Sequence, residues 1–296
     1  MKSDCLANKV AIITGASRGI GSAIATDLAR NGAKVVLAAR DAQKLADVVT
    51  RIREAGEQGV TFRTDLRDLE APQRLVEAAV AEFGGIDIVV NNAGATRRGE
   101  FLALTEEDWQ DSFALKFFGA IDIVVNNAGA TRRGAFLKLT EEDWHDSFAL
   151  KFFGTVRLVR AAWPHLKTRS GSIVTIAGVG GRTPGAEFAI GGSVNAALLS
   201  FTKAIAELGV EDGVQINAIN PGFIRTDRLR KRLESSAAAS GVTMIEAEQA
   251  MVRGANVSRL GEPDDIAYLV TFVVSAEGRF LHGSLIDADG GQTKTI

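Results

Sequence analysis

Short runs of apolar, β-branched residues alternate along the chain with segments in which apolar residues recur every three or four positions. The first pattern is typical of buried strands and the second of amphipathic helices. Strands are predicted at residues 9–13, 34–38, 59–63, 86–90, 172–176 and 215–219, and helices at 20–30, 42–55 and 72–83. This alternation predicts a parallel sheet with helices on both faces, connected by right-handed crossovers in a doubly wound α/β topology.

One segment interrupts the alternation because it occurs twice. Residues 86–119 recur as residues 121–154, and only three of the 34 aligned positions differ. Each copy contains a strand, the turn Asn-Asn-Ala-Gly and the start of a helix. No Pro- or Ser-rich linker divides the chain, so we predict a single domain, residues 1–296, that contains a tandem duplication.

A single position in the sheet can take only one copy, so we expect the other copy to leave the sheet. With copy two in the sheet, the surplus leaves near Gly84, away from the carboxyl ends of the strands. With copy one in the sheet, the surplus lies over the ligand crevice. We favour copy two, because this arrangement leaves the crevice intact. The displaced helix, residues 106–118, would then need cover from the body or from a neighbouring subunit.

Composition narrows the class of protein. The 296 residues are 46% hydrophobic, which is enough for a large core, and the net charge of −2 gives no reason to expect a nucleic-acid or anionic-membrane partner. The single cysteine, Cys5, excludes an internal disulfide framework and fits a reducing compartment. We see no signal segment and no apolar run that approaches the ~20 residues of a membrane helix. These features predict a cytoplasmic protein.

A glycine-rich turn at residues 14–21 follows the first predicted strand and opens the first predicted helix. Glycines permit a tight turn and a close approach of backbone N–H groups to a ligand. The positive end of the helix favours an anion, so the pyrophosphate of a dinucleotide fits there. The candidate cofactor-binding residues of this turn are Gly15, Ser17, Arg18, Gly19, Ile20 and Gly21.

The end of the second strand indicates which dinucleotide binds. An acidic residue at this position would bind the ribose 2′-hydroxyl of NAD, but the chain has Arg40 here. An arginine can pair with a 2′-phosphate through two charge-assisted hydrogen bonds, and Arg18 supplies a second positive charge nearby. We therefore predict NADP(H) rather than NAD(H). The alternative is that Arg40 is a solvated residue beside Asp41.

Several motifs occur in order along the chain: Thr14-Gly15-x-x-x-Gly19-x-Gly21, Asp65-Leu66, Asn126-Asn127-Ala128-Gly129 with its copy at 91–94, Asn220-Pro221-Gly222 with Thr226, and residues 259–266. Together these motifs resemble those of the short-chain dehydrogenase/reductase superfamily, above all its bacterial 3-oxoacyl-carrier-protein-reductase-like members. The resemblance spans nearly the whole chain. It implies a Rossmann-type sheet of about seven strands, a nicotinamide cofactor, a small carbonyl or secondary-alcohol substrate, and a homo-oligomer, either a dimer or a tetramer.

The resemblance also implies which residues hold the cofactor. Asp65 and Leu66 would hold the adenine, and Asn126 (or its copy Asn91) would line the cofactor cleft. The remaining cofactor candidates are Ala128 and Gly129 in the cleft, and Pro221, Gly222, Ile224 and Thr226 at the nicotinamide end.

The catalytic positions depart from the family pattern. The family uses an Asn that positions a water relay, a Ser that binds the carbonyl, a Tyr that acts as general acid and base, and a Lys that lowers the pKa of the Tyr. These positions align with Lys151 (Lys116 in copy one), Gly178, Gly191 and Asn195 respectively. Glycine has no proton to donate, so the usual general-acid contribution of ~10²–10⁴-fold is absent at Gly191.

Lysine and asparagine are thus exchanged between the two helices, and a positive charge remains in the expected pocket. Asn195 would bind the nicotinamide ribose, and Lys151 would polarise a carbonyl or donate a proton if burial lowers its pKa. The alternative for Lys151 is a surface lysine packed on Phe152 and Phe153. The adjacent glycines 191–192 suggest room for a backbone contact or a bulky ligand. No two histidines have ligand spacing, so we predict no metal.

Two functions remain open, and a third possibility is an inactive, misassembled chain. The first function is an NADP(H)-dependent oxidoreductase with an atypical active site, and the complete cofactor motifs favour it. The second is a non-catalytic NADP(H)-binding protein, such as a redox sensor or an assembly subunit. The replacement of all four catalytic residues favours this second function.

Overall fold

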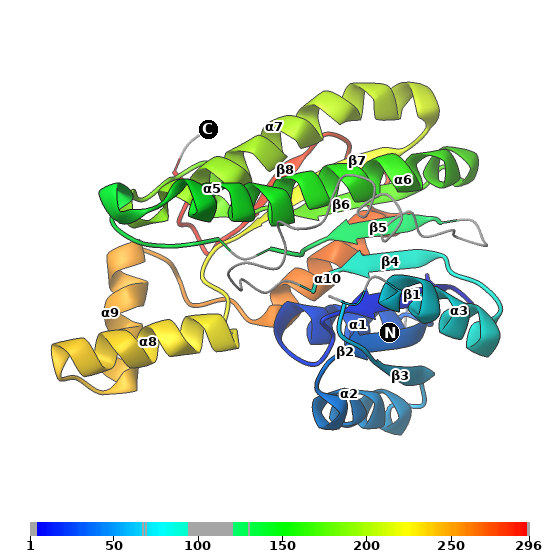
Figure 1. Ribbon diagram of the computed structural model, residues 1–296, viewed down its shortest axis with the longest axis horizontal. Helices are drawn as coiled ribbons and strands as arrows, with labels where there is room; N and C mark the ends of the chain where they lie inside the picture. Colours follow the sequence, from blue (N-terminus) through cyan, green and yellow to red (C-terminus); the bar gives the residue numbers. More distant parts are fainter. Residues whose placement is uncertain (1–4, 67, 69, 94–120, 130, 295–296) are drawn as a thin grey trace.

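The computed structural model describes residues 5–66, 68, 70–93, 121–129 and 131–294. One sheet of eight parallel strands, in the order β3-β2-β1-β4-β5-β6-β7-β8, forms the centre of the molecule (Figure 1). The strands are β1 (Val10–Thr14), β2 (Lys34–Ala39), β3 (Gly59–Arg63), β4 (Ile88–Asn91), β5 (Ile123–Asn126), β6 (Ser172–Ile176), β7 (Gln215–Pro221) and β8 (Leu285–Ala288). The doubly wound α/β fold is confirmed, with one strand more than the seven expected.

Helices cover both faces of the sheet (Figure 1). The α-helices are α1 (Gly19–Arg30), α2 (Ala42–Glu54), α3 (Ala71–Phe83), α5 (Glu141–Ser147), α6 (Gly154–Arg169), α7 (Ala189–Asp212), α8 (Asp227–Ser240), α9 (Met244–Ala255) and α10 (Pro263–Val274). Short turns of helix are η1 (Phe136–Lys138), η2 (Phe148–Phe153), η3 (Val179–Gly181) and η4 (Ala186–Phe188). Successive strand residues point to opposite faces. Ile13 therefore packs in a core with α1 and α10, and Ile12 in a core with α3 and α6.

Both copies of the duplicated segment contribute a strand to the sheet. β4 pairs with β1, β5 pairs with β6, and β4 and β5 pair with each other so that Ile88 lies opposite Ile123 and Asn91 opposite Asn126. The expectation that the sheet takes copy two alone is therefore wrong. The apolar strand of one copy can pair with the strand of the other as readily as with β1 or β6, so the sheet widens instead of expelling a copy.

The aspartates at the amino ends of the two copied strands share a cation. The Lys9 ammonium contacts both Asp87, at 3.5 Å, and Asp122. The backbone N–H of Val10 donates to Asp87 at 2.8 Å, and Arg169 donates to Asp122 at 2.8 Å. Burial opposes ionisation of Asp122, but the hydrogen bonds from Arg169 and Lys9 outweigh it and lower the pKa of this carboxyl. These contacts fix the register of the extra strand at its amino end.

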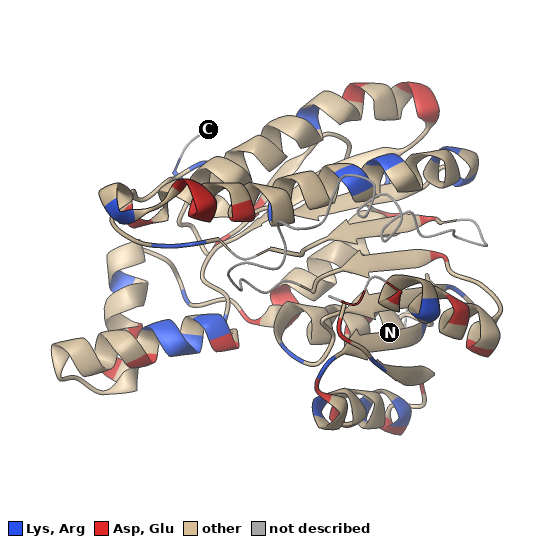
Figure 2. Ribbon diagram, viewed as in Figure 1, with Lys and Arg blue, Asp and Glu red and all other residues tan. Residues whose placement is uncertain are grey.

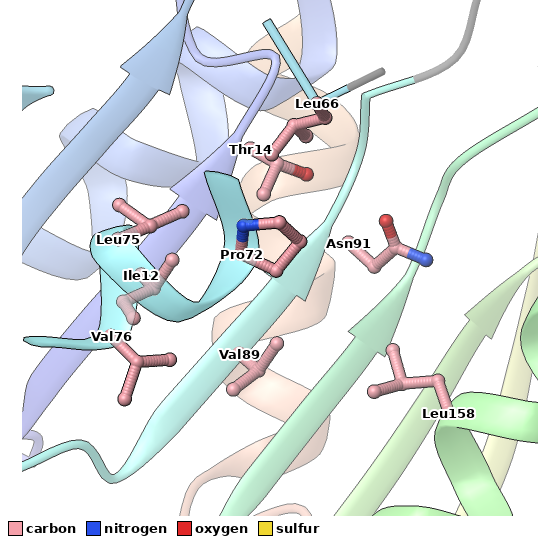
Figure 3. Close-up of a pocket in the computed structure, with 9 residues that line it drawn as sticks. All are labelled: Ile12, Thr14, Leu66, Pro72, Leu75, Val76, Val89, Asn91 and Leu158. Carbon is pink, nitrogen blue, oxygen red and sulfur yellow. The ribbon is translucent and has the colours of Figure 1, made fainter. Parts of the chain in front are cut away.

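A cavity lies among the described residues, between α3 and α6. The cavity, of about 40 Å³, has Leu75 and Val76 of α3 on one side and Leu158 of α6 on the other (Figure 3). Its remaining lining residues are Ile12, Thr14, Leu66, Pro72, Val89 and Asn91. The helix predicted at 106–118, and Lys116 within it, lie outside the described residues.

Residues 186–212, which include α7, are long and apolar enough to meet the length and composition of a membrane span. The expectation that no apolar run approaches this length therefore overlooked one segment. In the structure α7 packs against β7 and η3, and Ile190, Val194 and Leu198 are buried. This burial is typical of a core helix.

The helices α8 and α9 form a small lobe beside the body of the molecule (Figure 1). They pack on one another through a cluster of apolar side chains: Leu229, Leu233, Ala237, Ala247 and Leu260. The lobe begins directly after β7, at the end of the sheet where parallel α/β folds bind ligands. It therefore stands beside the predicted site.

Candidate functional site

The glycine turn has the backbone geometry that a pyrophosphate site requires. Gly15 and Gly19 have φ values of +63° and +59°, a region that L side chains rarely adopt. The helix α1 begins at Gly19, and the side chain of Arg18, the residue before it, makes no capping hydrogen bond. The positive end of α1 therefore lacks a side-chain cap at this residue, which suits an anionic ligand.

Copy one, rather than copy two, lies against this turn. Nδ2 of Asn92 donates to the carbonyl oxygens of Thr14, at 2.9 Å, and Gly15, at 3.0 Å. A Cβ on Gly21 would lie 2.1 Å from the same nitrogen, so this position has no room for a side chain. The Asn-Asn-Ala-Gly motif of copy one thus holds the glycine turn in place, which the choice of copy two for the sheet did not anticipate.

The motif of copy two lies one strand further from the turn. Asn126, predicted to line the cleft, is 3% exposed, and neither its Oδ1 nor its Nδ2 has a hydrogen-bond partner among the described residues. The N–H of Ala128 donates to the carbonyl of Asn91 at 2.7 Å. Gly129 packs against Lys151, because a Cβ on Gly129 would lie 2.7 Å from the lysine Cγ and Cδ. Copy two therefore lies against Lys151, the predicted catalytic lysine.

An open groove follows the carboxyl ends of β2 and β3. Its volume is about 410 Å³, within the range of ~300–1,000 Å³ typical of small-molecule sites. Arg40 and Arg63 both line it, and neither forms an ion pair within the part of the chain that the structure describes. Arg63 was missed from the sequence, because only the pairing of β3 with β2 brings it beside Arg40.

The other predicted residues of the adenine end divide between three places. Asp65 lines the same groove as Arg40. Leu66 lines the apolar cavity between α3 and α6 instead (Figure 3). Arg18 forms an ion pair with Asp227 at 2.9 Å, so its charge is directed to the start of α8. The second cation of the groove is Arg63 and not Arg18.

The loop after β7 faces the glycine turn. A Cβ on Gly19 would lie 3.6 Å from Cγ2 of Thr226, which places these two predicted residues on opposite sides of a narrow gap. Ile224 pairs with Gly261 in an isolated β-bridge. Thr226 thus borders the glycine turn despite the extra strand between β1 and β6. Gly222 lies against Asp289 instead, because a Cβ on Gly222 would lie 2.9 Å from the Cα of Asp289.

Lys151 lies beside Asn195, at the positions where the sequence predicts the catalytic residues. It belongs to η2, a turn of π-helix between α5 and α6, and such turns are frequent at functional sites. Its ammonium donates to Oδ1 of Asn195 and to the carbonyl of Ala177, both at 2.6 Å. Burial, with a smaller effect from Arg228, lowers the pKa of Lys151 to about 7. A lysine with this pKa can exchange a proton near neutral pH.

Asn195 is held in turn by the backbone at Gly178, the residue that aligns with the serine of the family. Its Nδ2 donates to the carbonyl of Gly178 at 3.3 Å, and it is 3% exposed. The N–H of Gly178 donates to Oδ1 of Asn220 at 3.4 Å, and Asn220 donates to Asp287 at 2.9 Å. A side chain on Gly178 would begin 2.9 Å from Nδ2 of Asn195. This network fixes the oxygen that accepts from Lys151.

Phe188 fills the space beside Gly191, the residue that the sequence alignment places at the tyrosine position of the family. A Cβ on Gly191 would lie 2.0 Å from Cε2 of the Phe188 ring. The expected room for a bulky ligand or a backbone contact is therefore occupied by the protein itself. Phe188 lies three residues before Gly191, at the start of α7, where residues i and i+3 share one face of a helix. That spacing was the signal in the sequence.

We predict opposite effects for Gly191→Ala in two backgrounds. In the wild-type chain the new methyl group meets the Phe188 ring, and overpacking of this kind costs ~1–3 kcal/mol. With Phe188→Ala already present, the same change should stabilise by up to about 1 kcal/mol, because alanine is the better helix residue. Urea unfolding of the four proteins measures both effects. Equal effects of Gly191→Ala in the two backgrounds would contradict the contact.

Comparisons with known proteins show which family the chain resembles. The profile described as Enoyl-(Acyl carrier protein) reductase matches residues 112–293, and that of short chain dehydrogenase matches residues 9–121. An uncharacterized oxidoreductase of Mycobacterium tuberculosis is 34% identical, over 97% of this chain and 93% of its own. The 3-oxoacyl-[acyl-carrier-protein] reductase of Vibrio cholerae is 30% identical, over 97% of this chain and 98% of its own.

Two solved structures have a similar fold. L-sorbose reductase from Gluconobacter frateurii, complexed with NADPH and L-sorbose, matches with a TM-score of 0.76 at 27% identity and full coverage of both chains. A short chain dehydrogenase from Burkholderia cenocepacia in complex with NADP matches with a TM-score of 0.66 at 27% identity, over 97% of this chain and 98% of its own. From these matches and the motifs, the chain belongs to the short-chain dehydrogenase/reductase superfamily.

Proposed function

We propose that this protein is an NADP(H)-dependent oxidoreductase that interconverts a carbonyl compound and a secondary alcohol. One observation carries the proposal: the Lys151 ammonium, at a predicted catalytic position, is fixed on Asn195 and the carbonyl of Ala177, and its pKa is lowered to about 7. Perturbed lysines of this kind concentrate at functional sites. In this protein Lys151 would supply the proton for which the superfamily uses a tyrosine.

The cleft fits the phosphorylated dinucleotide. Gly15 and Gly19 shape the pyrophosphate cradle, and Arg40 and Arg63 supply two cations for a 2′-phosphate. The uncapped N-terminus of α1 adds its dipole. Relatives whose structures carry NADPH or NADP share the fold. These residues support NADP(H) rather than NAD(H).

The residues of the pocket divide the chemistry between them. The bound nicotinamide supplies or accepts the hydride. In the reducing direction Lys151 donates a proton from Nζ to the oxygen of the substrate, and Asn195 orients this ammonium through Oδ1. The carbonyl of Ala177 holds a second N–H, which leaves the third for the substrate. In the oxidising direction the neutral amine accepts the proton.

The proposed cofactor preference predicts a specific loss of affinity. Arg40→Gln and Arg63→Gln should each weaken NADPH binding by about tenfold or more, because each removes a charged partner of the 2′-phosphate. NADH binding should not change, since NADH lacks that phosphate. Fluorescence titration of both nucleotides measures the ratio, and Arg51→Gln, an exposed arginine on α2, is the control. Equal losses for NADPH and NADH would place both arginines elsewhere.

Turnover distinguishes the proposal from its alternative, a non-catalytic NADP(H)-binding protein. Gly191 in the tyrosine position, with the Phe188 ring in the space beside it, favours the alternative, because glycine cannot act as the usual acid. We expect the wild-type chain to oxidise NADPH in the presence of at least one member of a panel of aldehydes, ketones and oxo acids. Tight NADPH binding without turnover on any member, in either direction, would establish the alternative instead.

We further propose a cytoplasmic homo-oligomer, a dimer or a tetramer. Several large apolar side chains are exposed on the helices and on the turn after α10: Phe153, Leu208, Val210, Tyr268, Phe272 and Phe280. Side chains of this kind become buried when subunits associate. The exposed cysteine, Cys5, is compatible with a reducing compartment. Light scattering of the purified protein measures the assembly.

A further inference from the structure

Cations surround the outer end of the Lys151 site. Arg228, on α8, donates from Nη2 to the carbonyl of Gly129 at 3.2 Å, and the stem of Lys151 packs against the same glycine. The Arg133 guanidinium lies 4.0 Å from the centroid of the Phe188 ring, the ring that fills the Gly191 position. Arg133 and Arg228 therefore approach the pocket from the loop after β5 and from the α8 lobe.

The charges of this group are not neutralised within the part of the chain that the structure describes. Arg133, Arg228 and Lys151 form no ion pair there, nor does Arg232, which lies over the ring of Phe223. Burial, then repulsion from Arg232, lowers the pKa of Arg133; attraction to Glu187 opposes this shift, and repulsion from Arg228 adds a smaller lowering effect. Like charges held together in this way gain free energy when an anion binds.

Neighbouring basic residues behave differently. Arg230, on the same helix as Arg228, pairs with Asp227 and Glu234, and Arg225 pairs with Glu248 and Glu262. Figure 2 shows basic positions on the first turns of α8 and on the loop that leads to α5, at the same end of the molecule. Arg133 and Arg228, by contrast, form no ion pair with any carboxylate of the described residues.

We infer that the substrate carries an anionic group, a carboxylate or a phosphate, which binds between Arg133 and Arg228 while its carbonyl faces Lys151; this inference rests on the proposed function. The guanidinium fork of arginine suits both anions. Because Gly129 alone separates Arg228 from the stem of Lys151, the anion and the carbonyl belong to one short molecule. A small oxo acid or a phosphorylated ketone has this shape.

Matched anionic and neutral substrates test the inference with NADPH-loaded protein. The wild-type chain should reduce acetoacetate with a kcat/KM at least about tenfold above that for ethyl acetoacetate, or dihydroxyacetone phosphate by the same factor above dihydroxyacetone. The pair with the larger ratio identifies the anion. Arg133→Gln and Arg228→Gln should each remove about tenfold for the anion and nothing for its neutral partner. Equal rates for the anionic and neutral members of both pairs would overturn the inference.

The control variant is Lys231→Gln, an exposed cation on the same helix that forms no ion pair among the described residues. It removes the same charge from α8 without touching the pocket, so it should leave both rates unchanged. If Lys231→Gln lowered kcat/KM for the anionic substrate as much as Arg133→Gln and Arg228→Gln do, the effect would come from the net charge of the protein, and the inference would be wrong.

A binding measurement tests the inference even if the protein reduces no carbonyl compound. Malonate should bind the NADPH-loaded protein more tightly than malonamide in calorimetry, and both arginine variants should lose this difference. Such binding without turnover would overturn the proposed reaction but support the anion site. Equal binding of malonate and malonamide would overturn the anion site, even if ketones are reduced. If the two variants weaken NADPH binding as much as malonate binding, the cations serve the cofactor and the inference is wrong.

Discussion

Replacement of Lys151 by methionine is expected to lower kcat/KM for carbonyl reduction by ~10²–10⁴-fold, the contribution of a general acid. Methionine keeps much of the length and packing of the stem against Gly129 but has no proton to donate. NADPH affinity should not change, because Arg40, Arg63 and the glycine turn are untouched. Steady-state kinetics and a nucleotide titration measure the two effects. Lys203→Met, an exposed lysine on α7, is the control and should keep full activity.

The pH dependence should identify Lys151 as the source of the proton. Its pKa of about 7 means that the ammonium is lost as the pH rises above neutrality. The kcat/KM for reduction should therefore fall by about tenfold per pH unit above pH ~7, and that for alcohol oxidation should rise to a plateau. A flat profile between pH 6 and 9, or an active Lys151→Met variant, would show that the proton comes from elsewhere.

Stability provides a readout that does not depend on turnover. The pKa of Lys151 is lowered from 10.5 to about 7 on folding, so between these values the unfolded chain binds more protons than the folded one. The free energy of unfolding should then rise with pH across this window, and the cost of the buried ammonium is fully present below pH ~7. Lys151→Met should remove this rise. An unaltered profile would contradict a buried, destabilised ammonium.

Deletion of residues 86–120 is expected to give a folded protein with a seven-stranded sheet and a higher kcat/KM. The junction joins Gly85 to Ile121, so β5 would take the place of β4 beside β1 with the same side chains in the same register. Asp122 would then reach the backbone N–H of Val10 as Asp87 does now, while keeping Arg169. Every pairing surface of the shorter sheet already exists.

The activity should change because the deletion moves the two halves of the site. At present β1, which carries the glycine turn, is three strand spacings from β6, about 14 Å, and the deletion leaves two, about 10 Å. A misplacement of 1 Å can cost ~10²-fold in rate, so we expect an increase of about that size. Circular dichroism, thermal unfolding and kinetics measure the outcome. Unchanged kinetics in a folded deletion variant would make the extra strand functionally passive.

Much of the fold could be predicted from local pattern. The strands and crossover helices follow from period and turn chemistry, and the glycine turn lies where its residues placed it. The fate of the duplication could not be predicted in this way. The local sequence pattern predicts a strand in each copy. It does not determine how many strands the sheet can include. The incorrect step was to treat that number as fixed.

The site divides along the same line. The alignment placed Lys151 and Asn195 in one region, because both align with positions that converge in the superfamily, but it did not predict the hydrogen bond between them, since Asn195 was expected to bind the nicotinamide ribose. Arg63 could not be placed, since only the pairing of β3 with β2 brings it to the end of β2. Phe188 had a local signal, its spacing of three residues to Gly191, but the sequence does not show that its ring turns onto that glycine. Packing and strand pairing, rather than residue type, give these two their roles.

The identical strands β4 and β5 also make the partner of β1 degenerate. A strand recognises its neighbour through side chains and register, and on both counts the two copies offer β1 the same surface. The choice between them falls to contacts outside the strands, such as Arg169 with Asp122 and Asn92 with the glycine turn. During folding two topologies therefore compete at nearly equal free energy, and a few flanking hydrogen bonds decide which sheet the chain completes.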